Sequence, residues 1–289
     1  MALYAFDGTG NEDEDFDTNT LEFFRAFQDP LKNDDPQKSR GSLYLKGIGT
    51  RARTRSGDVL SQKWGLGGHR RVREALDRLE NNQEAGDTEI HIAGFSRGAA
   101  LALSFANEIA HKYPDLRIGF VGLFDVVGQF GLPGREINAG HDLRRPPTAS
   151  RICHAMALDE TRLFFPLTRV SREDVTDAQV VEVWFRGVHS DVGGGNNNRT
   201  LNWVALHWTF QEAIRYGLAI DPAAVAANLA TRVDPMQISD HRLDVGVRRA
   251  IRPTDLLHAT VQLGPGLPGR PHNDPTRALR RIDDAGVIS

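Results

Sequence analysis

Three residues whose side chains could together perform acyl transfer each lie at the end of an apolar segment. Ser96 stands in GFSRG, Asp125 directly follows GFVGLF, and His189 comes shortly after VVEVWF. In serine hydrolases the histidine accepts the proton of the serine hydroxyl, and the carboxylate holds the imidazole in the tautomer that allows this transfer. The sequence therefore predicts Ser96 as the nucleophile, His189 as the general base and Asp125 as the orienting acid.

The surroundings of Ser96 favour a nucleophile elbow over a serine that merely occupies a turn. An elbow needs a strand, a sharp turn and a helix, so that the serine oxygen stands exposed at the carboxyl edge of the sheet. Residues 90–93 have the pattern of a strand, and residues 98–106 have that of a helix. Gly94 and Gly98 would let the strand and the helix cross closely around the turn.

The acid and the base each have an alternative. Asp125 could cap its strand in a turn without taking part in chemistry. The chain has ten histidines, and His91 and His111 lie in the strand and at the helix end of the predicted elbow, where they cannot easily reach back to the serine. His258, in DLLHATV, is the alternative base, whereas His189 follows its strand directly, in RGVHSDVGGG.

Hydrolysis also needs hydrogen-bond donors for the oxygen that becomes negative in the transition state. The backbone N–H of Arg97, the residue after the nucleophile, is the expected first donor. Gly8 or Thr9, in the turn DGTG after the first apolar run, is the expected second donor. We expect Asp7 to hold that turn and Asp191 to fix the loop after VVEVWF.

Strand and helix patterns alternate along the chain. Strands are expected at 3–6, 42–45, 89–93, 118–124 and 180–185, and helices near 19–27, 68–80, 97–112 and 201–216. The spacing of Asn19 and Glu22 matches a capping box at the start of the first helix. Such alternation predicts an open, mostly parallel α/β sheet with helices on both faces. We expect one domain over 1–289, with 128–150 as a loop-rich lid or insertion and 235–289 as a weakly structured extension packed on it.

Composition is that of an ordinary soluble globular protein, with a net charge of −3 and 40% hydrophobic residues. This charge gives no reason to expect nucleic acid as a partner. Cys153 is the only cysteine, so an intrachain disulfide is excluded. The first residues lack the basic and apolar regions of a signal peptide, and no run of about 18 apolar residues occurs. We expect a cytoplasmic protein, with export without a cleaved signal left open.

Seven short motifs occur in an order that resembles a known family. They are FDGTGN at 6–11, Thr18-Asn19, KGIGT at 46–50, GFSRGA at 94–99, GLFDVVG at 122–128, ALDETR at 157–162 and WFRGVHSDVGGG at 184–195. Their order and rough spacing are similar to those of the α/β-hydrolase family catalogued as domain of unknown function 2235. The resemblance implies an α/β-hydrolase-like fold and a bacterial source, and it places the family's triad on Ser96, Asp125 and His189. The family includes type VI secretion effectors that act as phospholipases.

Together these observations predict a serine hydrolase that cleaves carboxylic esters through an acyl-enzyme, as an esterase, lipase or phospholipase. The expected substrate is a small-molecule or lipid ester, and neither a cofactor nor a metal ion is expected. Soluble short-chain esters should be hydrolysed faster than bilayers, because no apolar span occurs and the predicted lid is charged. Peripheral contact with a membrane stays open, and the sequence identifies no protein partner.

Three alternatives belong to other functional classes. The chain could be a catalytically retired hydrolase scaffold that acts as a binding protein. FDGT is similar to the DxDGT motif of phosphotransferases with an aspartate nucleophile, but Ala5 occupies the place of that aspartate. A metal site at His189 and Asp191 would lack a third ligand.

Overall fold

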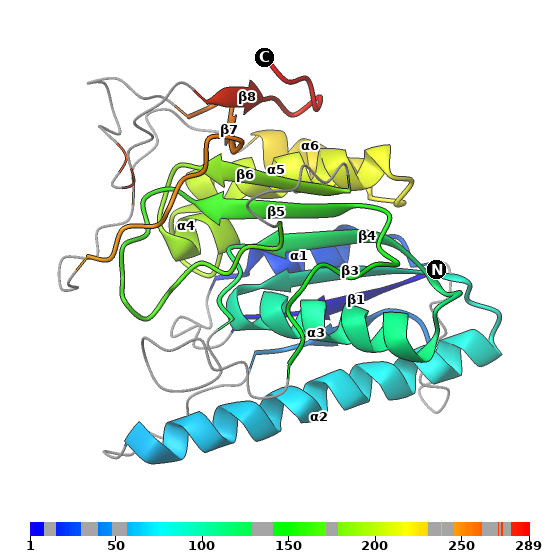
Figure 1. The fold of residues 1–289 in the computed structure, drawn as a ribbon. Coiled ribbons are helices and arrows are strands. Elements are labelled where there is room, and N and C mark those ends of the chain that lie inside the picture. Colours follow the sequence, from blue (N-terminus) through cyan, green and yellow to red (C-terminus); the bar gives the residue numbers. More distant parts are fainter. Residues whose placement is uncertain are drawn as a thin grey trace.

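The computed structural model of the chain describes residues 1–8, 16–29, 40–47, 57–128, 141–171, 179–230, 238, 246–261, 271, 273 and 279–289. Within them, one eight-stranded sheet forms the centre of the molecule (Figure 1), and all its strand pairs are parallel. In spatial order the strands are β2 (Leu43–Leu45), β1 (Ala2–Phe6), β3 (Glu89–Phe95), β4 (Arg117–Phe124), β5 (Ile152–Ala157), β6 (Val180–Phe185), β7 (Leu256–His258) and β8 (Arg280–Ile282).

Helices cover both faces of this sheet. They are α1 (Asn19–Ala26), α2 (Gly57–Glu84), α3 (Ser96–Lys112), α4 (His189–Gly193), α5 (Arg199–Arg215) and α6 (Pro222–Ala230). Figure 1 shows α2 and α3 on one face, and α1, α4 and α5 on the other. The predicted α/β-hydrolase-like architecture, with a parallel sheet between two helical layers, is confirmed.

Each strand contributes to two hydrophobic cores because successive side chains of a strand point to opposite faces. In β1, Tyr4 and Phe6 pack against the ring of Phe105 on α3, at centroid distances of 5.0 and 5.4 Å. The intervening Leu3 and Ala5 belong to the second core, on the side of α1 and α5. Burial on both faces explains why these strands are apolar along their whole length.

The sheet topology marks one edge as the place for a binding site. The carboxyl ends of parallel strands lie at the same edge, and ligands of open α/β sheets bind where the strand order reverses. Here β2 lies on one side of β1 and β3 lies on the other, so the direction in which successive strands are added to the sheet reverses at β1. Asp7 follows β1 and Ser96 follows β3, which places both residues at this reversal.

The first helix begins differently from the prediction. Thr18, and not Asn19, is the N-cap: its side-chain oxygen accepts a hydrogen bond from the Leu21 N–H at 3.1 Å. Asn19 is buried instead, and its amide donates to the carbonyl of Val192 at 2.8 Å, at the end of α4. The predicted capping box is therefore wrong, because tertiary contacts use the side chain that the local pattern assigned to a cap.

Five elements were not predicted from sequence: β5, β7, β8, α4 and α6. The polar side chain of His154 interrupts the apolar run of β5, and β8 begins with the charged pair Arg280-Arg281. The α4 helix has only five residues and includes a glycine from a stretch that is typical of a loop. Short or polar strands and single helical turns carry little periodic signal, so tertiary contacts decide them.

The two irregular segments of the prediction are described only in part. In 128–150, residues 141–150 lie along α3, where the Asn107 amide donates to the carbonyls of Asp142 and Arg144 at 3.1 and 2.8 Å. Residues 129–140 of the predicted lid lie outside the described residues. In 235–289, β7 and β8 extend the sheet by parallel pairing with β6 and with each other.

Candidate active site

Ser96 occupies a strained turn between β3 and α3. Its φ of 58° lies in the left-handed region, which non-glycine residues rarely adopt and which is typical of functional sites. A Cβ atom on Gly98 would lie 2.3 Å from the Phe6 carbonyl oxygen, and one on Gly94 would lie 2.6 Å from the Cα of Ala99. Both contacts are with backbone, so only glycine allows the helix to pass this close to the strands, as the elbow interpretation predicted.

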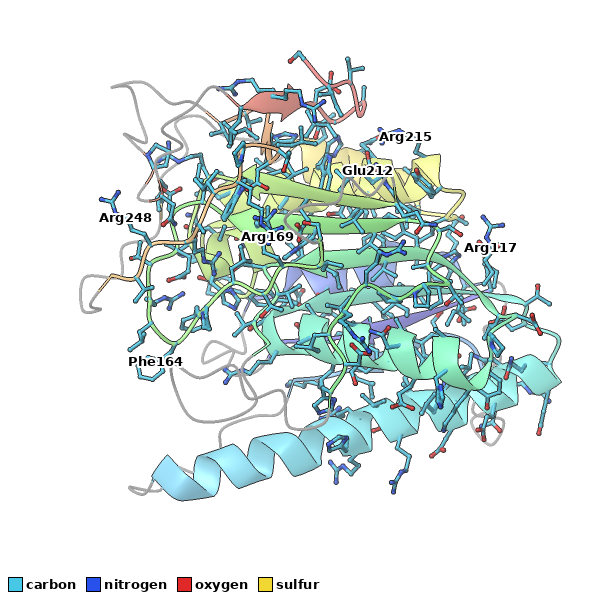
Figure 2. The ribbon with its side chains drawn as sticks, in the orientation of Figure 1. Arg117, Phe164, Arg169, Glu212, Arg215 and Arg248 are labelled. Atoms are coloured by element: carbon cyan, nitrogen blue, oxygen red, sulfur yellow. The ribbon has the colours of Figure 1, made fainter. Side chains whose placement is uncertain are left out.

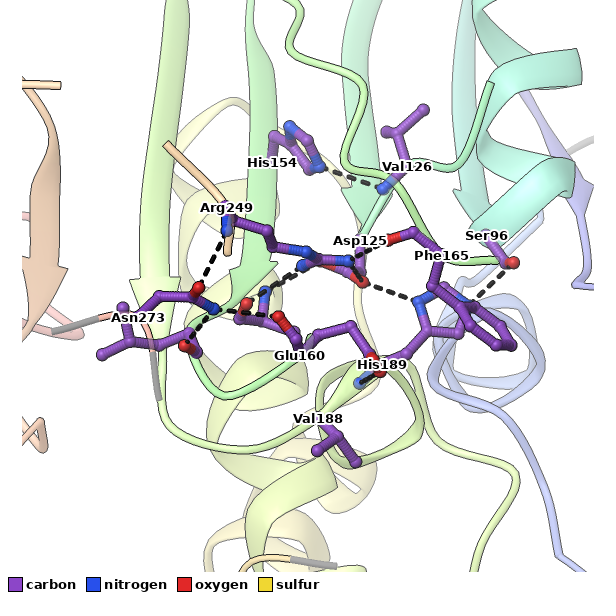
Figure 3. A network of polar contacts seen from close by, with 12 residues as sticks. Ser96, Asp125, Val126, His154, Glu160, Phe165, Val188, His189, Arg249 and Asn273 are labelled. Carbon is purple, nitrogen blue, oxygen red and sulfur yellow. Dashed lines mark hydrogen bonds and ion pairs between the residues drawn. The ribbon is translucent and has the colours of Figure 1, made fainter. Parts of the chain in front are cut away.

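The three predicted residues meet at the carboxyl edge of the sheet (Figure 3). His189 Nδ1 lies 2.6 Å from Oδ2 of Asp125, and His189 Nε2 lies 2.8 Å from Oγ of Ser96. An ionised carboxylate can only accept, so Nδ1 carries the proton, and Nε2 is left to accept the serine O–H. All three side chains are buried. Their placement is the one that acyl transfer requires, while their catalytic roles stay a prediction.

Asp125 is held in a second strained turn. Its φ is 42°, and its carboxylate Oδ1 accepts the backbone N–H of Ala157 at 2.8 Å. The Val127 N–H donates to the Ser96 carbonyl at 3.2 Å, which ties the acid's turn directly to the elbow. The Val126 N–H donates to Nε2 of His154 at 3.1 Å, shown in Figure 3. These bonds fix the carboxylate in one orientation.

Arg249 is the main residue of this site that sequence reasoning missed. Its guanidinium donates to both oxygens of Asp125, from one nitrogen to Oδ1 at 2.7 Å and from the other to Oδ2 at 2.9 Å. It comes from the C-terminal segment, 124 residues from Asp125, and its side chain is 5% exposed. Sequence offered no signal for it, because Arg249 lies among several arginines in a region without periodic pattern.

Burial and charge together set the protonation of the acid and the base. Burial alone would raise the pKa of Asp125, but the Arg249 cation and the His189 hydrogen bond outweigh it and hold that pKa well below its ordinary value. Burial lowers the pKa of His189, and the neighbouring Asp125 carboxylate opposes this shift without cancelling it. Asp125 is therefore ionised and His189 neutral at pH 7, which is the pairing that a general base needs.

The loop that carries His189 is held by hydrogen bonds to the two carboxylates of the ALDETR motif. Asp159 Oδ2 accepts the Gly187 N–H at 2.7 Å and pairs with the buried guanidinium of Arg186. Glu160 Oε2 accepts the His189 N–H at 3.0 Å. The motif was one of those that carried the family resemblance, but the sequence analysis assigned these two residues no role. In the structure both accept backbone N–H groups of the loop that carries His189.

Asp191 fixes the same loop from inside it, as predicted. Its Oδ2 accepts the Val188 N–H at 3.1 Å, and its Oδ1 accepts the side-chain amides of Asn196 and Asn198 at 3.0 and 2.9 Å. These bonds close the turn of α4 on which His189 is the first residue. In the part of the chain that the structure describes, no group of three or more histidine, cysteine, aspartate or glutamate side chains has a metal-site arrangement.

The backbone groups predicted to donate to the oxyanion differ in how the structure places them. The Gly8 N–H donates to the Asp7 carboxylate at 2.7 Å, so this structure gives Gly8 no part in an oxyanion hole. That carboxylate also accepts the hydroxyls of Thr18 and Tyr44, and Asp7 therefore holds its turn, as predicted. Arg97 directly follows Ser96, as the second residue of α3. It stays the predicted donor, and Thr9 lies outside the described residues.

Aromatic rings enclose the imidazole of His189. The Phe95 ring lies on one side at a centroid distance of 4.6 Å, and the Phe165 ring lies at 4.7 Å. The Arg162 guanidinium in turn covers the Phe165 ring at 3.9 Å. These contacts contribute to the burial of the imidazole, and burial is the main cause of its lowered pKa.

The alternative histidines are engaged elsewhere. His258 lies in β7, where its Nδ1 contacts the Thr260 hydroxyl at 2.8 Å and its Nε2 contacts Asp284 at 3.1 Å. His91 lies in the middle of β3, and burial lowers its pKa to about 4.

Among the described helices, none combines the length and the apolar character that crossing a bilayer would require.

Comparisons with known proteins agree with this architecture. A family model described as type VI secretion phospholipase effector Tle1-like, catalytic domain, matches residues 3–112 and 105–212. A 51-residue stretch is 39% identical to an uncharacterized protein, YEL023C, of Saccharomyces cerevisiae, and covers 16% of this chain and 8% of that protein.

Two solved structures match part of this chain, and the first is similar to it in fold. A crystal structure of an uncharacterized protein from Pseudomonas aeruginosa matches with 20% identity and a TM-score of 0.55, over 80% of this chain and 48% of that one. The Tle1 effector bound to the VgrG spike of the type 6 secretion system matches with 22% identity and a TM-score of 0.48, over 68% of this chain and 51% of that one. This chain therefore spans about half the length of these relatives.

Proposed function

Because the chain belongs to the family of Tle1-like phospholipase effector catalytic domains, we propose that it hydrolyses carboxylic esters of lipids through an acyl-enzyme on Ser96. The single observation that carries this proposal is the contact chain from Asp125 through His189 to Ser96, with hydrogen bonds of 2.6 and 2.8 Å. A scaffold without catalysis would have no need to keep both Ser96 and Asp125 in left-handed backbone conformations, which cost free energy.

The proposed reaction has two halves. Ser96 Oγ attacks the ester carbonyl while its proton passes to Nε2 of His189, and the Asp125 carboxylate stabilises the resulting imidazolium. The Arg97 N–H donates to the developing oxyanion. Collapse of the tetrahedral intermediate expels the alcohol, which takes the proton from Nε2 and leaves the acyl group on Ser96. Water then repeats the sequence, with His189 as its base, and releases the carboxylic acid.

A lipid surface as the source of substrate is supported by exposed apolar side chains beside the site. Leu163 and Phe164 are 41% and 52% exposed, and the next residue, Phe165, contacts His189. Val247 is 51% exposed, and its N–H donates to the Thr161 carbonyl at 2.7 Å, so it joins the same rim. Figure 2 shows Phe164 on the side of the molecule where β5 and β6 end. This rim favours lipid over the soluble short-chain ester that the lack of an apolar span and the charged predicted lid suggested.

The test compares two substrates and two variants. The purified chain is incubated with phospholipid vesicles and, separately, with a soluble short-chain ester, and the released acid is measured. Ser96→Ala should fold and lose hydrolysis of both substrates by several orders of magnitude. If the folded wild-type chain releases acid from neither substrate, the retired-scaffold alternative replaces the proposal.

The lipid part of the proposal has its own variant. Phe164→Ser should reduce release from vesicles several-fold and leave the soluble ester reaction near wild type, because it removes apolar area only from the rim. Leu229→Ser is the matched control, since Leu229 is 48% exposed on α6. Equal effects of the two variants on vesicles would remove the support for a lipid-contacting rim.

A further inference from the structure

Arg249 is a buried cation that the proposed reaction does not use. Its two terminal nitrogens donate to the two carboxylate oxygens of Asp125, in the bidentate geometry that makes arginine–carboxylate pairs strong and directional. The carboxylate thus has four hydrogen-bond donors: the Ala157 N–H, the His189 Nδ1–H and the two from Arg249. Only the bond to His189 belongs to the reaction, and the other three orient the acid.

The same guanidinium joins three segments of the site. One nitrogen donates to the Ala157 carbonyl at 3.0 Å, at the end of β5, and the other donates to the Phe165 carbonyl at 2.9 Å. Phe165 is the residue whose ring packs on the imidazole. Arg249 therefore holds, at the same time, the acid and one wall around the base.

The position of Arg249 is itself fixed by hydrogen bonds. Its backbone N–H donates to the side-chain oxygen of Asn273 at 2.8 Å. The amide nitrogen of Asn273 donates to the carbonyls of Leu158 and Glu160 at 2.7 and 2.9 Å, as Figure 3 shows. The guanidinium is therefore held by its own segment as well as by its acceptors.

Charge gives this residue a second effect. A cation on the far side of the carboxylate competes with imidazolium for the same negative charge. Burial is the main cause of the lowered pKa of His189, and Arg249 lowers it further, against the raising effects of Asp125 and Glu160. The charged groups around the imidazole come from four elements: Asp125 after β4, Glu160 and Arg162 after β5, Asp191 on α4, and Arg249.

We propose that Arg249 is a positioning residue, which aligns the Asp125 carboxylate with the base and keeps His189 in its neutral, proton-accepting form. This inference rests on the proposed function, because it assigns Arg249 a task in the same reaction. It predicts two separable losses of activity. One follows from losing the bidentate hydrogen bonds to Asp125, and the other follows from losing the positive charge.

Two substitutions separate these losses. Arg249→Lys keeps a cation but can donate to only one carboxylate oxygen at a time, so kcat should fall several-fold while the acidic limb of kcat/KM stays near that of the wild type. Arg249→Gln removes the charge. Its activity relative to wild type should fall several-fold more at about pH 6 than at about pH 8, because His189 then takes up a proton more readily. Arg248→Gln, which removes the exposed neighbouring charge, should change neither quantity.

A measurement without turnover keeps the two proposals distinguishable. In a Ser96→Ala background, the His189 ring is titrated by nuclear magnetic resonance with isotope-labelled histidine, and its signal is assigned with His189→Gln. Adding Arg249→Gln should move the His189 titration to higher pH. If the ring titrates this way but the wild type hydrolyses no ester, the proposed function fails while the coupling of Arg249 to His189 stands.

Three results would overturn the assignment of Arg249. One is an acidic limb of kcat/KM that is the same in Arg249→Gln and the wild type, together with a His189 titration that Arg249→Gln does not move in the Ser96→Ala background. Another is a wild-type kcat in Arg249→Lys, which would show that the fork is not needed. If Arg249→Gln does not fold, the test rests on Arg249→Lys. A His189 titration in Arg249→Lys that moves to lower pH would then contradict the proposed placement of the charge.

Discussion

Ser96 and His189 meet at a hydrogen bond of 2.8 Å, but they are held in place in different ways. Ser96 is placed by backbone packing, since Gly94 lets α3 approach β3, and Gly98 lets α3 approach the end of β1, within distances that no side chain would allow. His189 and Asp125 are placed by buried charges, among them Arg249, that come from widely separated parts of the chain. We call these the nucleophile side and the acid–base side.

The difference shows what each side depends on. The nucleophile side is mostly local: its strand, turn and helix lie within residues 89–112, and the end of β1 is the distant segment against which Gly98 packs. On the acid–base side, partners such as Asp125 and Arg249 lie 124 residues apart, so the side exists only after the C-terminal segment has docked. Removing one member of a buried ion pair leaves an uncompensated charge, which is strongly destabilising.

The largest expected loss of activity comes from removing either partner of the hydrogen bond between Ser96 and His189. Ser96→Ala and His189→Ala should each lower kcat/KM by several orders of magnitude, because one removes the attacking oxygen and the other removes its proton acceptor. The double variant should cost little more than either single change, since the members of a triad act as a unit. Fully additive losses in ester hydrolysis would show that the two residues do not share one step.

A stability measurement should separate the two sides next. Gly98→Ala places a Cβ 2.3 Å from the Phe6 carbonyl oxygen, and this overpacking should cost about 1–3 kcal/mol or more in the free energy of unfolding. Gly246→Ala is the control, because its Cβ would lie 3.5 Å from Thr161, an ordinary contact. Denaturant unfolding of both variants gives the comparison, and equal stabilities would contradict the steric account of the nucleophile side.

The smallest expected effect concerns the pH at which kcat/KM falls on the acidic side of its profile. Burial lowers the pKa of His189, so the folded state binds fewer protons than the unfolded state below the ordinary histidine pKa of about 6.5. The base therefore stays neutral into mildly acidic solution, and the stability of the fold decreases as pH falls. A profile of kcat/KM against pH should show its acidic limb below about 6.5. A limb above that value would mean that the Asp125 carboxylate outweighs burial.

The same contrast decides what sequence alone could predict. The elbow was predictable because its glycines, its strand and its helix lie in one short stretch around Ser96. Asp125 and His189 could be found because parallel strands end at one edge, so residues after separate strands must lie near one another. These arguments need only the order of elements and one residue at each strand end.

The supporting charges were not predictable by such arguments. Arg249, Asn273 and the carboxylates of ALDETR have partners that are distant in sequence, and no periodicity indicates which arginine or asparagine will be buried. The hydrogen bond from the Gly8 N–H to the side chain of Asp7 was not predictable either, although the two residues are neighbours in sequence. Side-chain capture of a backbone donor in a turn depends on geometry that composition does not fix.

The proposed reaction depends on a covalent acyl intermediate at Ser96, and a fluorophosphonate probe reports on this nucleophile itself. Such a probe reacts with a serine only when a base has activated its hydroxyl, and intact-protein mass spectrometry with peptide mapping locates the adduct. We expect one adduct on Ser96 in the wild type, and none in folded Ser96→Ala or folded His189→Ala. An unlabelled Ser96 in the folded wild-type chain, or equal labelling in His189→Ala, would contradict this expectation.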